Sequence, residues 1–313
     1  MSADPLSQTV SPRRPPATEQ IGQGKICGMV SAFWQQVLSG GLQVPTQRSI
    51  GDLTVELTEM LGNPDPRIRD GLAFPALATW IDKGVYDDLL LGLGDGMAVG
   101  LTQGLGESGT DSVFIRSFSA LVLAECIDRD SRAHLVPPAK ILHWGDQIAS
   151  WLLTERDERG FIPGKGWAHA IAHGADAIGA LGRSPRLAAA ELSVMLEVVL
   201  ERLLVPTHEF WVAGEPDRLA QAVMAILRRD LLGIDVVESW AERVGAAAVT
   251  EGDEDNHPYW GSGNAQAFLR SLYLQLSLAS PQPAVRADLL LAVIDQLRRS
   301  NPYYFTRLPD RDG

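Results

Sequence analysis

The sequence has 313 residues, of which 45% are hydrophobic, so it can bury a sizeable core without disulfides or a structural metal. Its formal net charge is −12, with 27 Lys and Arg residues against 39 Asp and Glu residues and no basic run longer than two. Such a surface repels phosphate groups, and we therefore expect neither nucleic acid nor an anionic membrane as a partner.

The composition favours helices over strands. Ala, Leu and Gly are abundant, whereas aromatic residues make up only 7% of the chain. This balance suits helices that pack closely through small side chains, because β-sheets favour β-branched and aromatic residues. The predicted fold class is all-α.

The N-terminal segment is predicted to be a disordered tail. Residues 1–23 contain four prolines among Ser, Thr and Gln, with almost no apolar side chains to bury. Residues 1–22 also lack the apolar stretch of a secretory signal peptide. We expect one helical domain over 24–305 and a short C-terminal tail at 306–313.

Within the domain, apolar residues recur at helical spacing between breaks of Pro and Gly. Asp65 followed by Pro66, and Asp111 followed by Ser112, are typical helix starts. No strand is expected. The pattern predicts helices at about 25–38, 50–61, 66–83, 86–105, 112–127, 139–156, 167–181, 185–204, 216–229, 236–244, 264–278 and 284–298.

About twelve antiparallel helices predict a stack of helix pairs, because each pair has an apolar face that only its neighbours can cover. Residues 63–77, a Pro/Asp turn that leads into an Arg-bearing helix, resemble the opening of a HEAT-type repeat. An open α/α superhelix with a concave groove is therefore the first prediction. A closed α/α toroid is the alternative.

The two cysteines, Cys27 and Cys126, lie in apolar helical stretches without metal or redox spacing. Free buried thiols in a reducing cytoplasm are the simplest interpretation. The most membrane-like stretch, 89–106, carries Asp95 and six glycines, so it is not expected to span a bilayer.

The densest group of polar residues follows Trp144. His169 and His173 are four residues apart on a predicted helix, and Asp176 follows three residues later on the same face. Two imidazoles and a carboxylate can hold a divalent metal, or a neutral His oriented by the acid can serve as a general base. A third interpretation is that both histidines simply pack between helices.

The loop before these histidines supplies further candidates. A solvated helix end is the usual interpretation of Glu155 and Asp157, and the alternative is that they face the histidine helix and complete a catalytic His/carboxylate cluster. Arg116, if buried, needs a carboxylate partner, for which Asp70, Asp157 or Asp176 is expected. The candidate ligand contacts are the cations Arg116, Arg159 and Lys165, with Lys165 suited to a small anion, and the aromatic residues Trp144 and Trp167.

Several familiar motifs are absent. The segment 160–166 lacks Walker spacing, and no strand precedes the glycines Gly92, Gly94 and Gly96, which we interpret as close helix packing. The acidic loop 250–263 lacks the EF-hand register and is expected to be a mobile loop, with a lid as the alternative.

Several stretches together resemble the bacterial family catalogued as domain of unknown function 2785. The resemblance covers roughly residues 50–300 and implies an all-helical fold with no established activity. Glu215-Pro216 departs from the family pattern, in which an acidic pair directly precedes the Arg at position 218. The matching stretches are Arg69-Asp70, Asp111 to Ser119, Glu155 to Gly160, Gly166 to Asp176 and Phe268 to Tyr273.

The first functional hypothesis is a binding protein that holds a peptide, a protein partner or a small molecule in a concave groove. The alternative is a hydrolase-type enzyme that uses the His/carboxylate cluster, with or without a divalent metal as cofactor. A carbohydrate-active toroid is a special case of the enzyme hypothesis.

Overall fold

The computed structural model describes residues 31–250, 257 and 259–305. Within these ranges the chain is almost wholly helical, which confirms the predicted all-α class. The predicted tails, Cys27 and half of the predicted loop 250–263 lie outside the described residues. None of the described helices is both long and apolar enough to cross a bilayer.

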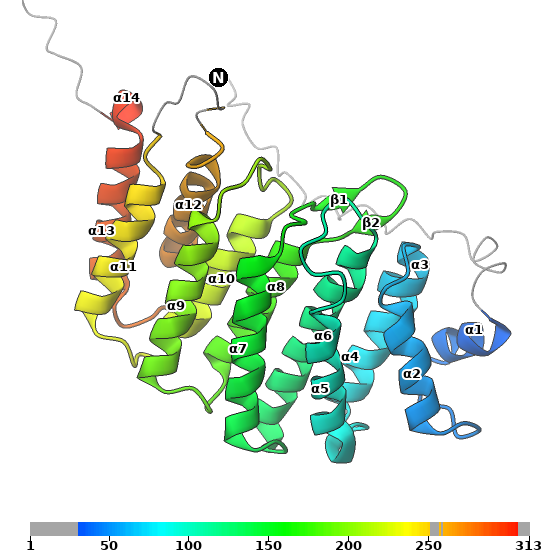
Figure 1. Cartoon of the computed structure of the whole chain (residues 1–313). Helices are drawn as coiled ribbons and strands as arrows, with labels where there is room; N and C mark the ends of the chain where they lie inside the picture. The colour runs from blue at the N-terminus through cyan, green and yellow to red at the C-terminus, as the bar shows by residue number, and fades with distance from the viewer. Residues whose placement is uncertain (1–30, 251–256, 258, 306–313) are drawn as a thin grey trace, which may run out of the picture.

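The helices run up and down in alternation along the chain (Figure 1). Most coincide with the predicted ranges to within a few residues. Their bounds are α1 Ala32–Ser39, α2 Ile50–Met60, α3 Pro66–Ile68, α4 Phe74–Asp82, α5 Leu90–Gly100, α6 Ser112–Ala133, α7 Pro138–Thr154, α8 Ala170–Arg183, α9 Ala189–Leu204, α10 Glu215–Leu227, α11 Ile234–Ala247, α12 Gly263–Leu278, α13 Arg286–Ser300 and α14 Pro302–Phe305.

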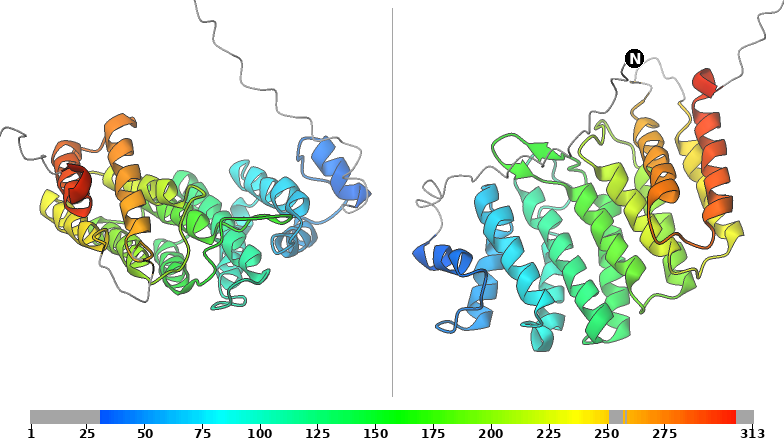
Figure 2. Two further views of the ribbon diagram at one scale, coloured as in Figure 1. Left: turned by 90° about the horizontal axis from the view of Figure 1, so that it is seen from above. Right: turned by 180° about the vertical axis from the view of Figure 1, so that it is seen from behind.

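The helices form two layers. Helices α4, α6, α8, α10 and α12 pack side by side in one layer, and α5, α7, α9, α11 and α13 do so in the other. Seen from above, the layers bend into an arc with the layer of α4, α6, α8, α10 and α12 on its inner side and α2 with the outer layer (Figure 2). The N-terminal and C-terminal helices lie at opposite ends, so the fold is an open α/α superhelix and not the closed toroid.

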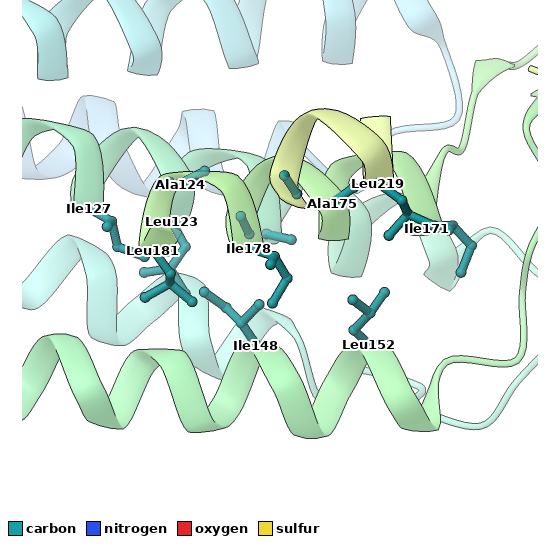
Figure 3. Packing of buried hydrophobic residues seen from close by; sticks show 14 of the residues in the cluster. Leu123, Ala124, Ile127, Ile148, Leu152, Ile171, Ala175, Ile178, Leu181 and Leu219 are labelled. Atoms are coloured by element: carbon teal, nitrogen blue, oxygen red, sulfur yellow. The ribbon is translucent and has the colours of Figure 1, made fainter. Parts of the chain in front are cut away.

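The core lies between the two layers, and α8 is at its centre. Leu152 and Ile148 of α7 meet Ile171 and Ile178 of α8, with α6 and α10 on either side (Figure 3). The small residues of α8 allow this close approach. A Cβ at Gly174 would lie only 2.6 Å from a methyl group of Leu152. Apolar burial between the layers is the main source of stability.

The predicted helix 66–83 is interrupted by a π-helical turn, η2 (Arg69–Ala73), between α3 and α4. Pro75, just after the turn, has no N–H to donate, and its ring would clash with a carbonyl one turn earlier in a regular helix. The wider turn relieves this clash, and the N–H of Phe74 bonds to the carbonyl of Arg69, five residues back.

Two other segments differ from the prediction. The predicted helix 86–105 is shortened to α5 with a 3₁₀ turn, η3 (Asp87–Leu89), before it. Although no strand was expected, β1 (Phe161–Ile162) and β2 (Gly166–Trp167) form a small antiparallel hairpin. The turn between the strands requires left-handed backbone at Gly164, with φ of 79°.

Candidate functional site

A buried ion pair joins α6 to the end of α7. Arg116 Nε donates to Glu155 Oε2 at 2.6 Å, and neither side chain is exposed to solvent. Arg116 also donates to the carbonyls of Gln103 and Gly104, and Trp151 Nε1 donates to Glu155. Because the hydrogen-bond donors around this carboxylate belong to the protein itself, we interpret the ion pair as a structural contact between α6 and the end of α7.

The expected partners of Arg116 were wrong. Asp70, Asp157 and Asp176 each pair with a different arginine, namely Arg69, Arg159 and Arg218. Glu155 reaches Arg116 because α7 ends beside the N-terminal half of α6. The distance along the chain is 39 residues, so no local pattern indicates the pairing.

The segment after α7 is linked to two other loops and to α9. Asp157 accepts a hydrogen bond from the N–H of Gly109 in the loop before α6. Glu158 pairs with the buried Arg202 of α9 and accepts from Trp211 Nε1 in the loop before α10. These carboxylates are engaged by arginines and N–H groups, and therefore Glu155 and Asp157 lack the free oxygen that the predicted catalytic cluster needs.

His169 lies just before α8, not within the helix as predicted. Its backbone is left-handed, with φ of 52°, and its ring stacks on Trp167 at 4.3 Å between centroids. Nε2 lies 3.1 Å from the carbonyl oxygen of Ala213 and 3.9 Å from Oε1 of Glu215. Burial, together with the charge of Arg218, lowers the pKa of His169 to about 4. The ring is therefore neutral near pH 7.

His173 lies in the first turn of α8 and is enclosed. Its ring meets Phe118 edge-on at 4.9 Å and His169 at 5.7 Å. Burial is the main reason that its pKa lies well below the usual value, and Arg218 lowers it further. Among the described residues nothing bonds to its buried Nδ1. A sealed, neutral imidazole cannot exchange protons with a substrate, so this placement favours packing.

Asp176 points its carboxylate at Arg218, which binds it through both Nε and Nη2. Both side chains are partly exposed. Across the described ranges no three His, Cys, Asp or Glu side chains are grouped as a metal site would require. The metal and acid/base roles of His169, His173 and Asp176 stay predictions.

The remaining predicted ligand contacts are divided between core and surface. Trp144 is fully buried, and its Nε1 donates to Asp95 at 2.9 Å. Trp167 is 41% exposed on the hairpin and meets Phe161 edge-on. Lys165 pairs with Asp111 at 2.6 Å.

A groove with a volume of about 980 Å³ lies between α2 and α5. Helix α2 packs on α4 and η2, whereas α5 packs on α6 and α7, so the outer layer opens between them. The floor comes from α6. The apolar lining includes Val55, Leu89, Leu93, Met97 and Ile115.

Glycines form the α5 wall of this groove. Gly92 and Gly96 both line it, and a Cβ at either position would meet no atom within 4 Å. Gly100 continues the row and packs on Ser119, whose buried hydroxyl has no hydrogen-bond partner among the described residues. The expected close packing is therefore right for Gly94, whose Cβ would lie 2.2 Å from Trp144, and wrong for Gly92 and Gly96.

One end of the groove is acidic. Glu59 lies at the C-terminal end of α2, while Glu107 and Asp111 follow α5, and all three line the groove. Hydrogen bonds from Ser112 and Thr110 hold the pKa of Glu107 below its usual value. The C-terminal ends of α2 and α5 add partial negative charge. The arrangement suits an apolar ligand with a cationic group.

Sequence reasoning missed this groove, although one signal was present. Gly92, Gly96 and Gly100 recur every four residues, which places them on one face of α5. Nothing in the sequence indicates that the facing helix, α2, does not pack against this face of α5.

The model of the family described as Protein of unknown function (DUF2785) matches residues 101–274, more than half of the chain, and the chain therefore belongs to this family. This confirms the resemblance seen in the sequence. The match includes the Arg116–Glu155 pair and both histidines, while α2 and α5 precede it. No curated protein and no solved structure matches the sequence.

Proposed function

We propose that this member of the family is a helical binding protein that holds an amphipathic helix of a partner protein in the groove between α2 and α5. The occupant has an apolar face and carries basic residues near the acidic end of the groove. We further propose that the superhelix is of the HEAT type and works in the cytoplasm, where the buried thiol of Cys126 stays reduced.

The observation that carries the proposal is the interrupted outer layer. From α5 to α13 each helix of this layer packs on the next, but between α2 and α5 the 980 Å³ groove takes the place of such a contact. A groove along two helices is the usual receptor for a third helix, which inserts its apolar side chains between them. Bare glycines at 92 and 96 let the occupant approach the α5 backbone closely.

Charge complementarity selects the kind of helix. Glu59 and Glu107 have no ion-pair partner among the described residues, and the net charge of the chain is −12. A helix with Lys or Arg at the matching end is attracted both by these two carboxylates and by the net negative charge of the chain. An acidic or uncharged helix does not.

An enzymatic role receives less support. Glu155, Asp157 and Asp176 are each bound by an arginine, and His173 is sealed. A hydrolase needs a free base beside a cavity that admits substrate. These contacts therefore support the binding protein over the hydrolase alternative.

The test uses the full chain and a fluorescein-labelled helical peptide of about 18 Leu, Ala and Lys residues, followed by fluorescence anisotropy. A scrambled peptide of the same composition, without an apolar face, controls for non-specific attraction to an acidic protein. We expect the amphipathic peptide to bind at least about tenfold more tightly than the scrambled one, a difference of about 1.4 kcal/mol.

Gly96→Leu should fill the groove and weaken binding of the amphipathic peptide by about tenfold or more. Val99→Leu is the matched control, because Val99 lies on α5, is exposed and does not line the groove. Equal binding of the two peptides, or unchanged binding by Gly96→Leu, would overturn the proposal.

A further inference from the structure

A second cavity lies at the opposite end of the superhelix from the groove. Its volume is about 320 Å³, and its described lining comes from α12, α14 and the loops before α10 and α12. The walls are aromatic, with Phe210, Tyr259 and Tyr304 beside His257. Phe210 and His257 meet edge-on, with ring centroids 5.5 Å apart.

Arg270 is the cation of this cavity. It is exposed, and within the described ranges no acidic side chain pairs with it. Its Nη2 donates to Gln266 Oε1 and to Asn301 Oδ1, both at 3.1 Å. These neutral amides orient the guanidinium without neutralising it, so its charge stays available to a ligand.

The two amides are themselves held in place. Gln266 is 4% exposed, and its Nε2 donates to the carbonyl of Ala248 at 2.9 Å. Asn301 is 7% exposed and donates to the carbonyl of Leu297 at 3.1 Å. Arg270 is therefore supported by two buried side chains that are each bonded to the backbone, which is more than a surface arginine requires.

The start of α12 reinforces the positive potential. Gly263, the first residue of this 16-residue helix, lines the cavity on the same helix face as Gln266 and Arg270. The N-terminal end of a helix carries partial positive charge and unpaired N–H groups. The Ser262 side chain does not cap this end, since its hydroxyl lies 2.9 Å from that of Thr250, and the N–H of Gly263 itself donates to the carbonyl of Tyr259 at 2.7 Å.

We infer that this cavity binds a small aromatic anion, whose carboxylate or phosphate contacts Arg270 and whose ring stacks on the aromatic walls. Guanidinium groups bind both kinds of oxyanion through paired N–H groups. Phe210 and Tyr259, each nearly half exposed, offer ring faces to a planar group.

The test is a titration of the full chain with phenyl phosphate, benzoate, inorganic phosphate and benzyl alcohol, followed by ligand-observed NMR. We expect both aromatic anions to bind and benzyl alcohol to bind at least about tenfold more weakly, because it lacks the charge. Inorganic phosphate should also bind more weakly than phenyl phosphate. Binding of benzyl alcohol as tightly as benzoate, or no binding of either aromatic anion, overturns the inference.

Arg270→Gln should weaken binding of both anions by about tenfold or more. Arg243→Gln, the same substitution at an arginine of α11 that pairs with Glu197, should change it by less than about twofold. Arg270→Lys keeps the charge and should give an intermediate affinity. Phe210→Ala should lower the affinity for phenyl phosphate while leaving that for inorganic phosphate unchanged; equal losses for the two ligands would contradict the proposed role of the walls.

Discussion

Two glycines on α5 allow a direct test of the groove. Gly94 and Gly96 lie two residues apart on the same helix, so replacement by Ala removes the same backbone entropy from each and gains about 0.5–1 kcal/mol of helix propensity at both. What differs is the space that the new methyl group meets. A Cβ at Gly96 has no atom within 4 Å, whereas one at Gly94 lies 2.2 Å from a ring carbon of Trp144.

Gly96→Ala should therefore raise the free energy of unfolding by about 0.5–1 kcal/mol. Gly94→Ala gains the same propensity but must displace the fully buried Trp144, which also holds Asp95 through its indole N–H. Overpacking of this kind costs about 1–3 kcal/mol. Because the propensity term cancels, the difference between the two variants should equal this overpacking cost.

The assay is urea denaturation followed by circular dichroism, with the midpoints compared at equal slope. We expect the midpoint of Gly96→Ala to exceed that of the wild type and the midpoint of Gly94→Ala to lie below it. If Gly96→Ala lowers the midpoint as much as Gly94→Ala does, position 96 is packed against another element and the groove is closed in solution.

Three further predictions concern stability. Glu155→Gln should lower the free energy of unfolding by about 3–5 kcal/mol in a urea titration, because it leaves the unexposed Arg116 without its counter-charge; a loss under about 1 kcal/mol would mean that water reaches the pair. Asp176→Asn, which breaks the partly exposed pair with Arg218, should cost at most about 1 kcal/mol in the same assay, and a loss as large as that of Glu155→Gln would refute the contrast. The folded-state pKa of His169 lies at about 4, below its ordinary value of 6.5, so below about pH 6.5 the unfolded chain binds a proton that the folded chain does not. The free energy of unfolding should thus fall between pH 6.5 and 4, with this histidine contributing up to about 1.4 kcal/mol per pH unit. His169→Asn, which tolerates the left-handed backbone, should reduce the pH dependence of the free energy of unfolding relative to the wild type. Parallel curves of stability against pH for the two proteins would contradict the assignment.

The helices could be predicted because their signals are local. Pro66 after Asp65 and Ser112 after Asp111 set helix starts that the structure confirms for α3 and α6. The π turn before α4 was not predicted, since Pro75 can also kink or end a helix. Which outcome occurs depends on the packing of η2 against α2, a contact that is not local.

The candidate site was harder to predict because its contacts join distant segments. Asp70, Asp157 and Asp176 were the expected partners of Arg116, and only the position of the C-terminal end of α7 brings Glu155 to it instead. The groove between α2 and α5 likewise follows from where two helices fail to meet. Helical spacing indicates which face of α5 is bare, but it does not indicate what lies opposite.

The Arg116–Glu155 pair also affects the rim of the groove. Arg116 holds the carbonyls of Gln103 and Gly104, which line the acidic end, while its carboxylate partner at the end of α7 is held by Trp151 Nε1 and by the N–H of Asp157. That rim is thus preorganised. A helix that docks there would not need to order a loop, and the entropy that such ordering consumes is available as affinity.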